Sequence, residues 1–252
     1  MKWWWCCLSI VLGLLVVLGA TFSPAFNSRL FPPHIMYDDS PMKQSMPKII
    51  HQTWKTNDVN EEQRQSIESW KKHYPKYQHV LWTDKSIEEF VHTHFSWYLQ
   101  TWNKLRPFIK KVDTVRYMWM FHYGGIYADI DMDSIKRFSF EDPKYEGSAM
   151  IPVQSKDLQW EKGSDASSPA LLTSSKGHPF WIFMLNSISK RYHLPVLKAT
   201  GPIALADALL EYTSDHSIEH KKIVLLSEAK FGIGSFKYLK EYAYHFNAST
   251  WV

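Results

Sequence analysis

The sequence predicts an α/β domain in which a central, mainly parallel sheet is flanked by helices. Segments typical of strands alternate with segments of helical spacing, in the order strand, helix, strand, helix. This order favours a parallel sheet covered by helices. The chain has 252 residues, 45% of them hydrophobic, which is enough for one substantial core. Carboxylates follow directly after a predicted buried strand, at the edge where such sheets bind ligands.

The first predicted core strand covers residues 48–54, and the second covers 77–82. Between them, Asn60 and Gln63 form a capping pair that begins a helix, and Pro75 ends it. The other expected elements are a helical stretch over 83–105, a strand over 149–153, helices over 179–192 and 203–212, and a short strand over 223–226. A glycine-broken aromatic loop over 231–236 is expected to form a lid or a membrane-facing edge.

The helix that precedes the carboxylates is predicted from a 4,3,4,3 spacing, which places one face inward. The residues of that face are Phe108, Val112, Val115, Trp119 and His122. Asp113 and Arg116 lie one turn apart on the neighbouring face, close enough to act together. Gly124 and Gly125 supply the left-handed conformation that ends the helix and leads into the strand.

Residues 126–130 are predicted to form that buried strand, and Asp129, Asp131 and Asp133 crowd negative charge around its end. Such a cluster is costly unless a cation neutralises it. Alternate carboxylates opposite phosphate oxygens are the ligands with which Mg²⁺ or Mn²⁺ bridges a nucleotide diphosphate. We therefore expect Asp131, with Asp129, to hold Mn²⁺ or Mg²⁺.

Other interpretations of the acidic cluster require different residues around it. A calcium-binding EF-hand would need glycine and glutamate where the chain has Ser134 and Phe140, so that interpretation fails. A phosphatase with an aspartate nucleophile would need a second acidic pair downstream, and none is convincing. A solvated carboxylate-rich loop without function is the remaining alternative.

The first part of the chain predicts a membrane anchor. Residues 3–22 contain no charged residue and suffice to cross a bilayer as a helix. We divide the chain into a transmembrane anchor (1–22), a proline-containing stem (23–46) and one domain (47–252). A cleaved secretory signal ending near residues 19–23 is the alternative. The few flanking charges favour a lumenal domain, so we expect a single-pass type II protein of the Golgi or another secretory membrane.

Composition excludes some classes of partner. The formal net charge is only +4 and no dense basic stripe is present, so nucleic acid is not expected as a partner. Both cysteines, Cys6 and Cys7, fall within the predicted anchor, so the domain is expected to have no disulfide. A regulatory or partner subunit stays an open possibility.

The central motif carries a family resemblance. Asp113-Thr-Val-Arg-Tyr117, followed by Tyr123-Gly-Gly-Ile-Tyr-Ala-Asp-Ile-Asp131, resembles the signature of the DXD-containing sugar transferases of glycosyltransferase family 32. That family includes the fungal inositol phosphoceramide mannosyltransferases and the initiating α-1,6-mannosyltransferases. Shorter matches lie at 47–54, 81–84, 200–202 and 248–251. The resemblance covers about residues 47 to 252 and implies a GT-A-like fold.

The resemblance implies a metal-dependent, retaining glycosyltransferase. It would move a hexose from a nucleotide-sugar donor to a hydroxyl of a lipid or glycan. The similarity to the sphingolipid enzymes favours mannose from GDP-mannose and an inositol phosphoceramide acceptor, while UDP-hexose donors stay open. No residue stands out as a general base, so orientation and leaving-group stabilisation would carry catalysis. The alternative is an inactive module that binds nucleotide sugar or a partner.

The resemblance also implies roles for individual residues. Asp113 and Arg116 would bind donor-sugar hydroxyls or phosphate, with a purely structural salt bridge as the alternative. Trp54 and Tyr127 would lie near the nucleotide, although Trp54 could equally be a core residue. In the aromatic C-terminal segment, His245 would complete the metal shell beside Asp129 and Asp131. Ser249 or Thr250 would donate to a phosphate oxygen, and Trp251 would close the pocket. A last edge strand that serves only packing is the alternative for this segment.

Overall fold

The structure, a computed structural model, describes residues 45–153, 161–214, 222–231 and 241–246. The predicted anchor at 1–22 and the stem up to residue 44 lie outside the described residues, as do Ser249 and Trp251. Within the described ranges, no helix has the length and apolar character needed to cross a bilayer.

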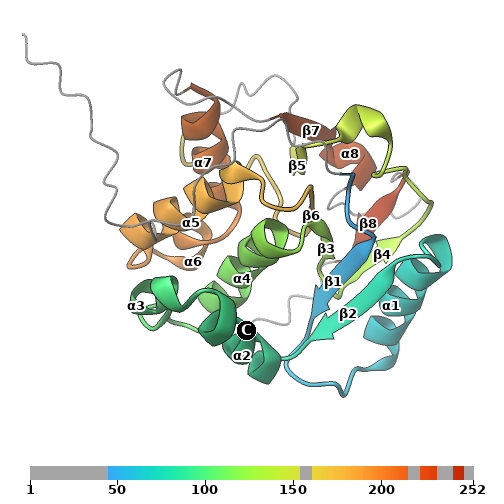
Figure 1. Cartoon of the computed structure of the whole chain (residues 1–252), viewed down its shortest axis with the longest axis horizontal. Helices are drawn as coiled ribbons and strands as arrows, with labels where there is room; N and C mark the ends of the chain where they lie inside the picture. Colours follow the sequence, from blue (N-terminus) through green and yellow to red (C-terminus); the bar gives the residue numbers. More distant parts are fainter. Residues whose placement is uncertain (1–44, 154–160, 215–221, 232–240, 247–252) are drawn as a thin grey trace, which may run out of the picture. The chain divides into compact units, whose positions relative to one another are not determined.

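Six strands form the central sheet in the order β2-β1-β3-β6-β5-β7 (Figure 1). Their bounds are β1 Ile49–Thr53, β2 Gln78–Trp82, β3 Gly125–Ala128, β5 Ala149–Val153, β6 Leu171–Ser174 and β7 Ile223–Ser227. Pairs β1–β2, β1–β3 and β5–β7 are parallel, whereas β6 runs antiparallel to both of its neighbours. The prediction of a mainly parallel sheet is confirmed. Strand β6 was not predicted from the sequence.

A separate two-stranded ribbon pairs β4 (Met132–Ser134) with β8 (Ala243–His245). The strands are antiparallel, and the register places Met132 opposite His245 and Ser134 opposite Ala243. Strand β4 begins directly after Asp131. The ribbon therefore joins the predicted acidic cluster to a segment more than 100 residues later in the chain.

Two pieces of local sequence chemistry fold as predicted. Asn60 and Gln63 exchange side-chain to backbone hydrogen bonds at the start of α1, each 2.9 Å long. Gly124 and Gly125 have φ angles of 69° and 88°, which only glycine adopts readily. A Cβ atom at Gly124 would lie 2.6 Å from the backbone nitrogen of Lys176, so any larger residue at this position would clash with the backbone.

Helices pack around the sheet (Figure 1), and several of them differ from the prediction. The principal helices are α1 Glu61–His73, α2 Asp84–His94, α4 Ile109–His122, α5 Pro179–Arg191 and α7 Pro202–Ser214. Short helical segments are η2 Ser96–Tyr98, α3 Leu99–Trp102, η3 Pro143–Tyr145, α6 Val196–Ala199 and α8 Glu228–Phe231. The single stretch predicted over 83–105 is broken at Phe95, whose backbone leaves the helical region while its side chain turns into the core. Phe231 ends α8 and is buried, while the rest of the predicted aromatic loop, residues 232–236, lies outside the described residues.

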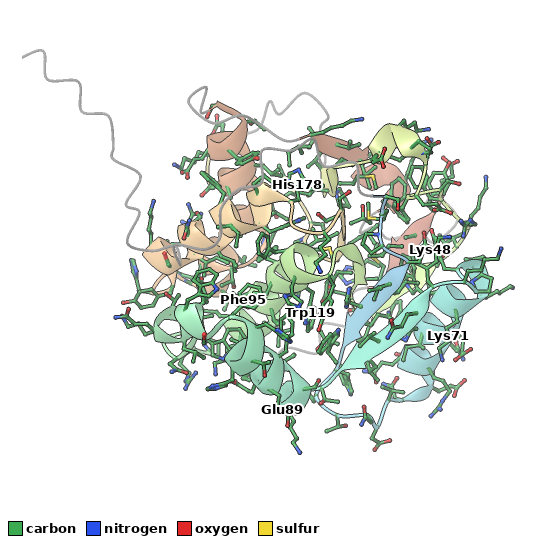
Figure 2. All side chains as sticks on the ribbon, viewed as in Figure 1. Lys48, Lys71, Glu89, Phe95, Trp119 and His178 are labelled. Atoms are coloured by element: carbon green, nitrogen blue, oxygen red, sulfur yellow. The ribbon has the colours of Figure 1, made fainter. Side chains whose placement is uncertain are left out.

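Helix α4 is buried on all sides from Lys110 to Met120, rather than on one face as predicted. It contacts α2, α5 and α6 as well as strands β3 and β6, and Figure 1 shows it beside those strands. Trp119, labelled in Figure 2, stacks on Trp82 with ring centroids 4.9 Å apart. The helix that carries Asp113 and Arg116 is thus a rigid central element.

Candidate active site

A tight turn between β3 and β4 positions the two carboxylates of the DXD motif. The backbone N–H of Asp129 donates to the carbonyl of Ala170 at 2.8 Å, and the N–H of Met132 donates to the carbonyl of Asp129 at 3.0 Å. The side chain of Gln52, at the end of β1, also donates to the Asp129 carbonyl at 3.3 Å. Strands β1, β3 and β6 together fix the turn.

Three ligand-type side chains converge at this turn. Asp129, Asp131 and His245 each offer an atom, and these atoms all lie within 4.8 Å of one another. Nε2 of His245 lies 2.9 Å from Asp131 Oδ1 and 3.7 Å from Asp129 Oδ2. The N–H of Phe246 donates to the Asp131 carbonyl at 3.1 Å, which holds the end of β8 against the motif. All three predicted metal ligands are therefore brought together.

The chemistry of this group fits a divalent cation. Two carboxylates and one imidazole nitrogen point at a common position, which is unfavourable unless a proton or a cation lies between them. Burial alone would lower the pKa of His245, but the carboxylates of Asp131 and Asp129 outweigh burial and raise it. The other ring nitrogen, Nδ1, is buried without a hydrogen-bond partner among the described residues, so the hydrogen bond of this ring is made to a carboxylate through Nε2. Asp129, Asp131 and His245 would hold Mn²⁺ or Mg²⁺.

Arg116 links Asp129 of the converging group to Asp113. Its guanidinium is buried, with Nη2 3.0 Å from Asp113 Oδ1 and Nη1 3.1 Å from Asp129 Oδ1. Nη1 also donates to the carbonyl of Pro169 at 3.1 Å. The planar fork thus holds two carboxylates that a point charge could not hold together. Burial opposes the charge of Arg116, but Asp129 and the other neighbours keep its pKa well above its ordinary value.

Both carboxylates beside Arg116 accept further hydrogen bonds. Thr200 Oγ1 donates to Asp113 Oδ2 at 2.8 Å, and the Tyr127 hydroxyl donates to Asp129 Oδ1 at 2.5 Å. Burial raises the pKa of Asp113 and of Asp129, while Arg116 opposes that rise. Because Oδ1 of Asp129 already has two donors, Oδ2 is the oxygen that faces His245.

Tyr127, Trp54 and Asp133 are not members of the converging group. Tyr127 is fully buried beneath Arg116, with the guanidinium carbon 4.7 Å from the ring centre, so its contact is with Asp129 rather than with an open cavity. Trp54 is half-buried just after β1, and the ammonium of Lys55 lies 5.7 Å from its ring centre. Asp133 points from the middle of β4 and is not a member of the converging group.

Helix α1 holds β4 through a row of polar side chains that sequence reasoning missed. Ser66 Oγ and Trp70 Nε1 both donate to the Met132 carbonyl, at 2.8 and 2.6 Å. The N–H of Ser134 donates to Ser69 Oγ at 2.9 Å, and His73 Nδ1 lies 3.0 Å from Ser134 Oγ. The spacing of these four α1 residues places them on one helix face. This periodicity could have indicated from the sequence that the face makes polar contacts.

Part of the chain matches known proteins in sequence. Residues 60–152 match the model of the family "Glycosyltransferase sugar-binding region containing DXD motif". The chain is 34% identical over 170 residues to Inositol phosphoceramide mannosyltransferase 3 of Schizosaccharomyces pombe, covering 64% of this chain and 44% of that protein. It is 26% identical over 238 residues to Mannosyl phosphorylinositol ceramide synthase SUR1 of Saccharomyces cerevisiae, covering 92% of this chain and 59% of that protein.

A solved structure, "PaToxG Glycosyltransferase", is similar with a TM-score of 0.48 and 21% identity, covering 67% of this chain and 70% of that one. The chain spans about half the length of the curated relatives that it matches. The matched region of residues 60–152 contains Asp113, Arg116, Asp129 and Asp131. The resemblance predicted from these residues is confirmed, because residues 60–152 match the model of the DXD-containing sugar-binding region.

Proposed function

We propose that this chain is a metal-dependent glycosyltransferase with a GT-A-like domain that transfers a hexose from a nucleotide-sugar donor. One observation carries the proposal. The converging group of Asp129, Asp131 and His245 lies directly beside the buried Asp113–Arg116 pair. All of these residues except His245 belong to the matched sugar-binding region. The cation site could bind the diphosphate of the donor, and the neighbouring carboxylate–guanidinium pair could bind its sugar hydroxyls.

Each residue has a role that its contacts support. A divalent cation held by Asp131, Asp129 and His245 would supply Lewis-acid stabilisation of the departing diphosphate. Arg116 fixes the orientation of Asp129 and Asp113, and Thr200 fixes the second oxygen of Asp113. Asp113 would accept a hydrogen bond from a donor-sugar hydroxyl. Catalysis would rest on orientation and leaving-group stabilisation, with retention of the anomeric configuration.

For the substrates, we propose mannose from GDP-mannose as the donor group and a lipid carrying inositol phosphate as the acceptor. The support is that the matched relatives from both yeasts are named for mannosyl transfer to, or synthesis of, inositol-containing ceramides. Because this chain spans about half of each relative, the acceptor has to be tested on this protein directly.

We further propose that residues 1–22 are retained as a single-pass anchor with the domain in the lumen of the Golgi. The uncharged segment at 3–22 supports this topology. Asn247 begins the sequon Asn-Ala-Ser, so its glycosylation would report a lumenal position. Protease protection of the domain in sealed membranes is the more general test, and a domain open to protease on the cytosolic side would overturn the topology.

The test of activity uses the full chain purified in a neutral detergent. GDP-mannose and several UDP-hexoses are offered with Mn²⁺, with Mg²⁺ and with EDTA, first for hydrolysis and then for transfer to lipid and glycan acceptors. We expect hydrolysis of one donor that EDTA abolishes. Asp133→Asn is a matched control, because Asp133 is a neighbouring carboxylate outside the converging group. Nucleotide-sugar binding without turnover of any donor would instead indicate an inactive binding module.

A further inference from the structure

The turn that carries the DXD motif is closed by a backbone carbonyl that accepts two hydrogen bonds. The carbonyl of Asp129 accepts from the N–H of Met132 at 3.0 Å and from the side-chain amide of Gln52 at 3.3 Å. A carbonyl oxygen has two lone pairs, so both are occupied. Because this carbonyl belongs to the peptide that leads into Ile130 and Asp131, its direction helps to set where the carboxylate of Asp131 lies.

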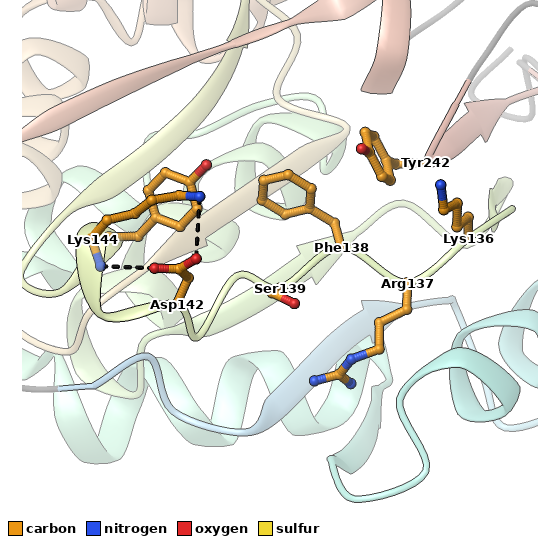
Figure 3. Close-up of a pocket in the computed structure, with 8 residues that line it drawn as sticks. Lys136, Arg137, Phe138, Ser139, Asp142, Lys144 and Tyr242 are labelled. Atoms are coloured by element: carbon orange, nitrogen blue, oxygen red, sulfur yellow. Dashed lines mark hydrogen bonds and ion pairs between the residues drawn. The ribbon is translucent and has the colours of Figure 1, made fainter.

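The β4–β8 ribbon that follows the turn is held at both of its ends. At the end remote from the motif, the N–H groups of Ile135 and Lys136 donate to the Tyr242 carbonyl at 2.8 and 3.3 Å. Figure 3 shows Lys136 and Tyr242 at the pocket that they line there. At the motif end, strand β1 reaches the turn through the side chain of Gln52. This side chain therefore holds the end of the ribbon that lies next to the candidate metal centre.

Gln52 is itself held by a histidine of the neighbouring strand. Its side chain is fully buried, and its Oε1 lies 2.7 Å from Nε2 of His79 on β2. Strands β1 and β2 are parallel, and their register pairs Gln52 with Leu81, two residues after His79. Because side chains alternate between the two faces of a sheet, His79 and Gln52 project on the same face. The contact thus follows directly from the pairing of the two strands.

The chemistry of the groups fixes the direction of both hydrogen bonds. The Asp129 carbonyl can only accept, so the amide nitrogen of Gln52 faces it and the amide oxygen faces His79. That oxygen can also only accept, so Nε2 of His79 carries a hydrogen. Burial lowers the pKa of His79 to about 4, which keeps the ring neutral at pH 7, with its single N–H directed at Gln52.

The turn would be less constrained without this histidine. The oxygen of Gln52 would then be a buried acceptor without the donor that it now has, which is unfavourable. Rotation of the amide toward another donor would remove its nitrogen from the Asp129 carbonyl. Groups that orient metal ligands in this indirect way typically change metal affinity by about 10- to 100-fold when they are replaced.

We propose that His79 is a positioning residue of the candidate metal centre: it orients the amide of Gln52, and that amide holds the turn that carries Asp129 and Asp131. This proposal rests on the metal-dependent function proposed above. The contact of His79 is with Gln52 rather than with a ligand atom. Its effect therefore reaches the metal through the geometry of the turn and not through its charge.

The experiment measures the Mn²⁺ dissociation constant of the full chain in neutral detergent at pH 7 by isothermal titration calorimetry. His79→Asn and His79→Leu remove the donor at the position of Nε2, and each should raise the dissociation constant about tenfold. His79→Gln should bind Mn²⁺ as the natural chain does, because its longer side chain can place an amide N–H near that position. His122→Asn is the matched control, because His122 is also half-buried but its ring packs against His94 and Tyr123. Its affinity should be unchanged.

A double variant tests whether His79 acts through Gln52. Gln52→Met removes the amide at similar volume and should also weaken Mn²⁺ binding about tenfold. Adding His79→Asn to Gln52→Met should cause no further loss, because the contact between the two side chains is already absent. Losses that multiply in the double variant would overturn the proposal, since His79 would then act independently of Gln52.

Stability is measured separately, by circular dichroism and urea denaturation without metal, so that only folded variants are compared. Unchanged Mn²⁺ affinity in folded His79→Asn and His79→Leu would overturn the proposal, because His79 would then contribute packing alone. An equal loss of affinity in His79→Gln would also overturn it, because the donor would not be the property that matters. A natural chain that binds no Mn²⁺ would refute the proposed metal-dependent function and this proposal with it, whereas the other outcomes refute only the role of His79.

Discussion

The indole Nε1 of Trp70 donates a hydrogen bond of 2.6 Å to the backbone carbonyl of Met132, the residue that directly follows Asp131. On its other edge, Met132 pairs with His245 of β8. The strand next to the DXD motif is therefore held between a helix and a second strand. Asp131 and His245 keep their separation because both are tied to Met132.

The first prediction concerns this contact. Trp70→Phe removes the indole donor and leaves Ser66 as the remaining side-chain donor to Met132. We expect the free energy of unfolding to fall by about 2 kcal/mol from the lost hydrogen bond and the smaller ring. We also expect weaker Mn²⁺ binding, because Asp131 loses part of its support. Urea denaturation and Mn²⁺ titration provide the measurements.

Trp97→Phe is the control for this prediction, because Trp97 is a half-buried tryptophan of η2. Its Mn²⁺ affinity should equal that of the natural chain. If Trp70→Phe lowers stability but binds Mn²⁺ with unchanged affinity, α1 contributes packing and does not position the metal ligands.

The second prediction is that Asp131→Asn abolishes Mn²⁺ binding and donor hydrolysis while the fold is retained. Without metal, the free energy of unfolding should change by less than about 1 kcal/mol. The relief of repulsion with Asp129 is offset by the weaker contact with His245, which lies 2.9 Å from Asp131. Circular dichroism checks the fold and titration calorimetry checks the metal. Full activity in the variant would refute the metal assignment.

The third prediction concerns Arg116→Lys. A single ammonium cannot reach Asp113, Asp129 and the Pro169 carbonyl together, so at least one buried carboxylate loses its positively charged partner. We expect a loss of about 3 kcal/mol in the free energy of unfolding, together with a large fall in donor hydrolysis. Arg64→Lys, on the exposed face of α1, is the matched control and should change neither quantity measurably. Unchanged stability and activity in Arg116→Lys would exclude both a structural and a functional role.

The fourth prediction is a pH dependence of stability that arises from His51. Burial lowers the pKa of His51 to about 4 in the folded chain. The neutral ring accepts from Trp82 Nε1 at 3.1 Å, and its Nε2 lies 3.1 Å from the Gly124 carbonyl. Between pH 6.5 and pH 4, the unfolded chain binds a proton at this ring that the folded chain does not, so stability falls as the pH falls.

The contribution of His51 to this loss between pH 7 and pH 5 is about 2 kcal/mol. His51→Gln should therefore show a smaller decrease in the free energy of unfolding over this interval, by about that amount, whatever its stability at pH 7. Burial also lowers the pKa of His79 and of His122 to about 4, so some pH dependence should persist in the variant. Equal decreases in the variant and the natural chain would show that His51 is not the responsible group.

Local sequence chemistry determined a definite part of this protein. The capping pair of Asn60 and Gln63, the glycine turn at Gly124 and Gly125, and the strand before Asp129 depend on neighbours within a few residues. Backbone preference and apolar spacing decide such features, so they can be predicted without knowledge of the fold. The same holds for the composite motif that revealed the family resemblance.

Tertiary structure alone decided how the candidate site is assembled. The antiparallel strand β6, the pairing of β4 with β8 and the donors from α1 to Met132 all join segments that are distant in the chain. Arg116 reaches Asp129 because α4 and β3 pack together, and no local spacing specifies that contact. Such long-range pairing depends on which surfaces pack together when the whole chain folds. The sequence pattern identified Asp129 and Asp131 as candidate ligands and the family resemblance added His245, whereas packing brought the three side chains together.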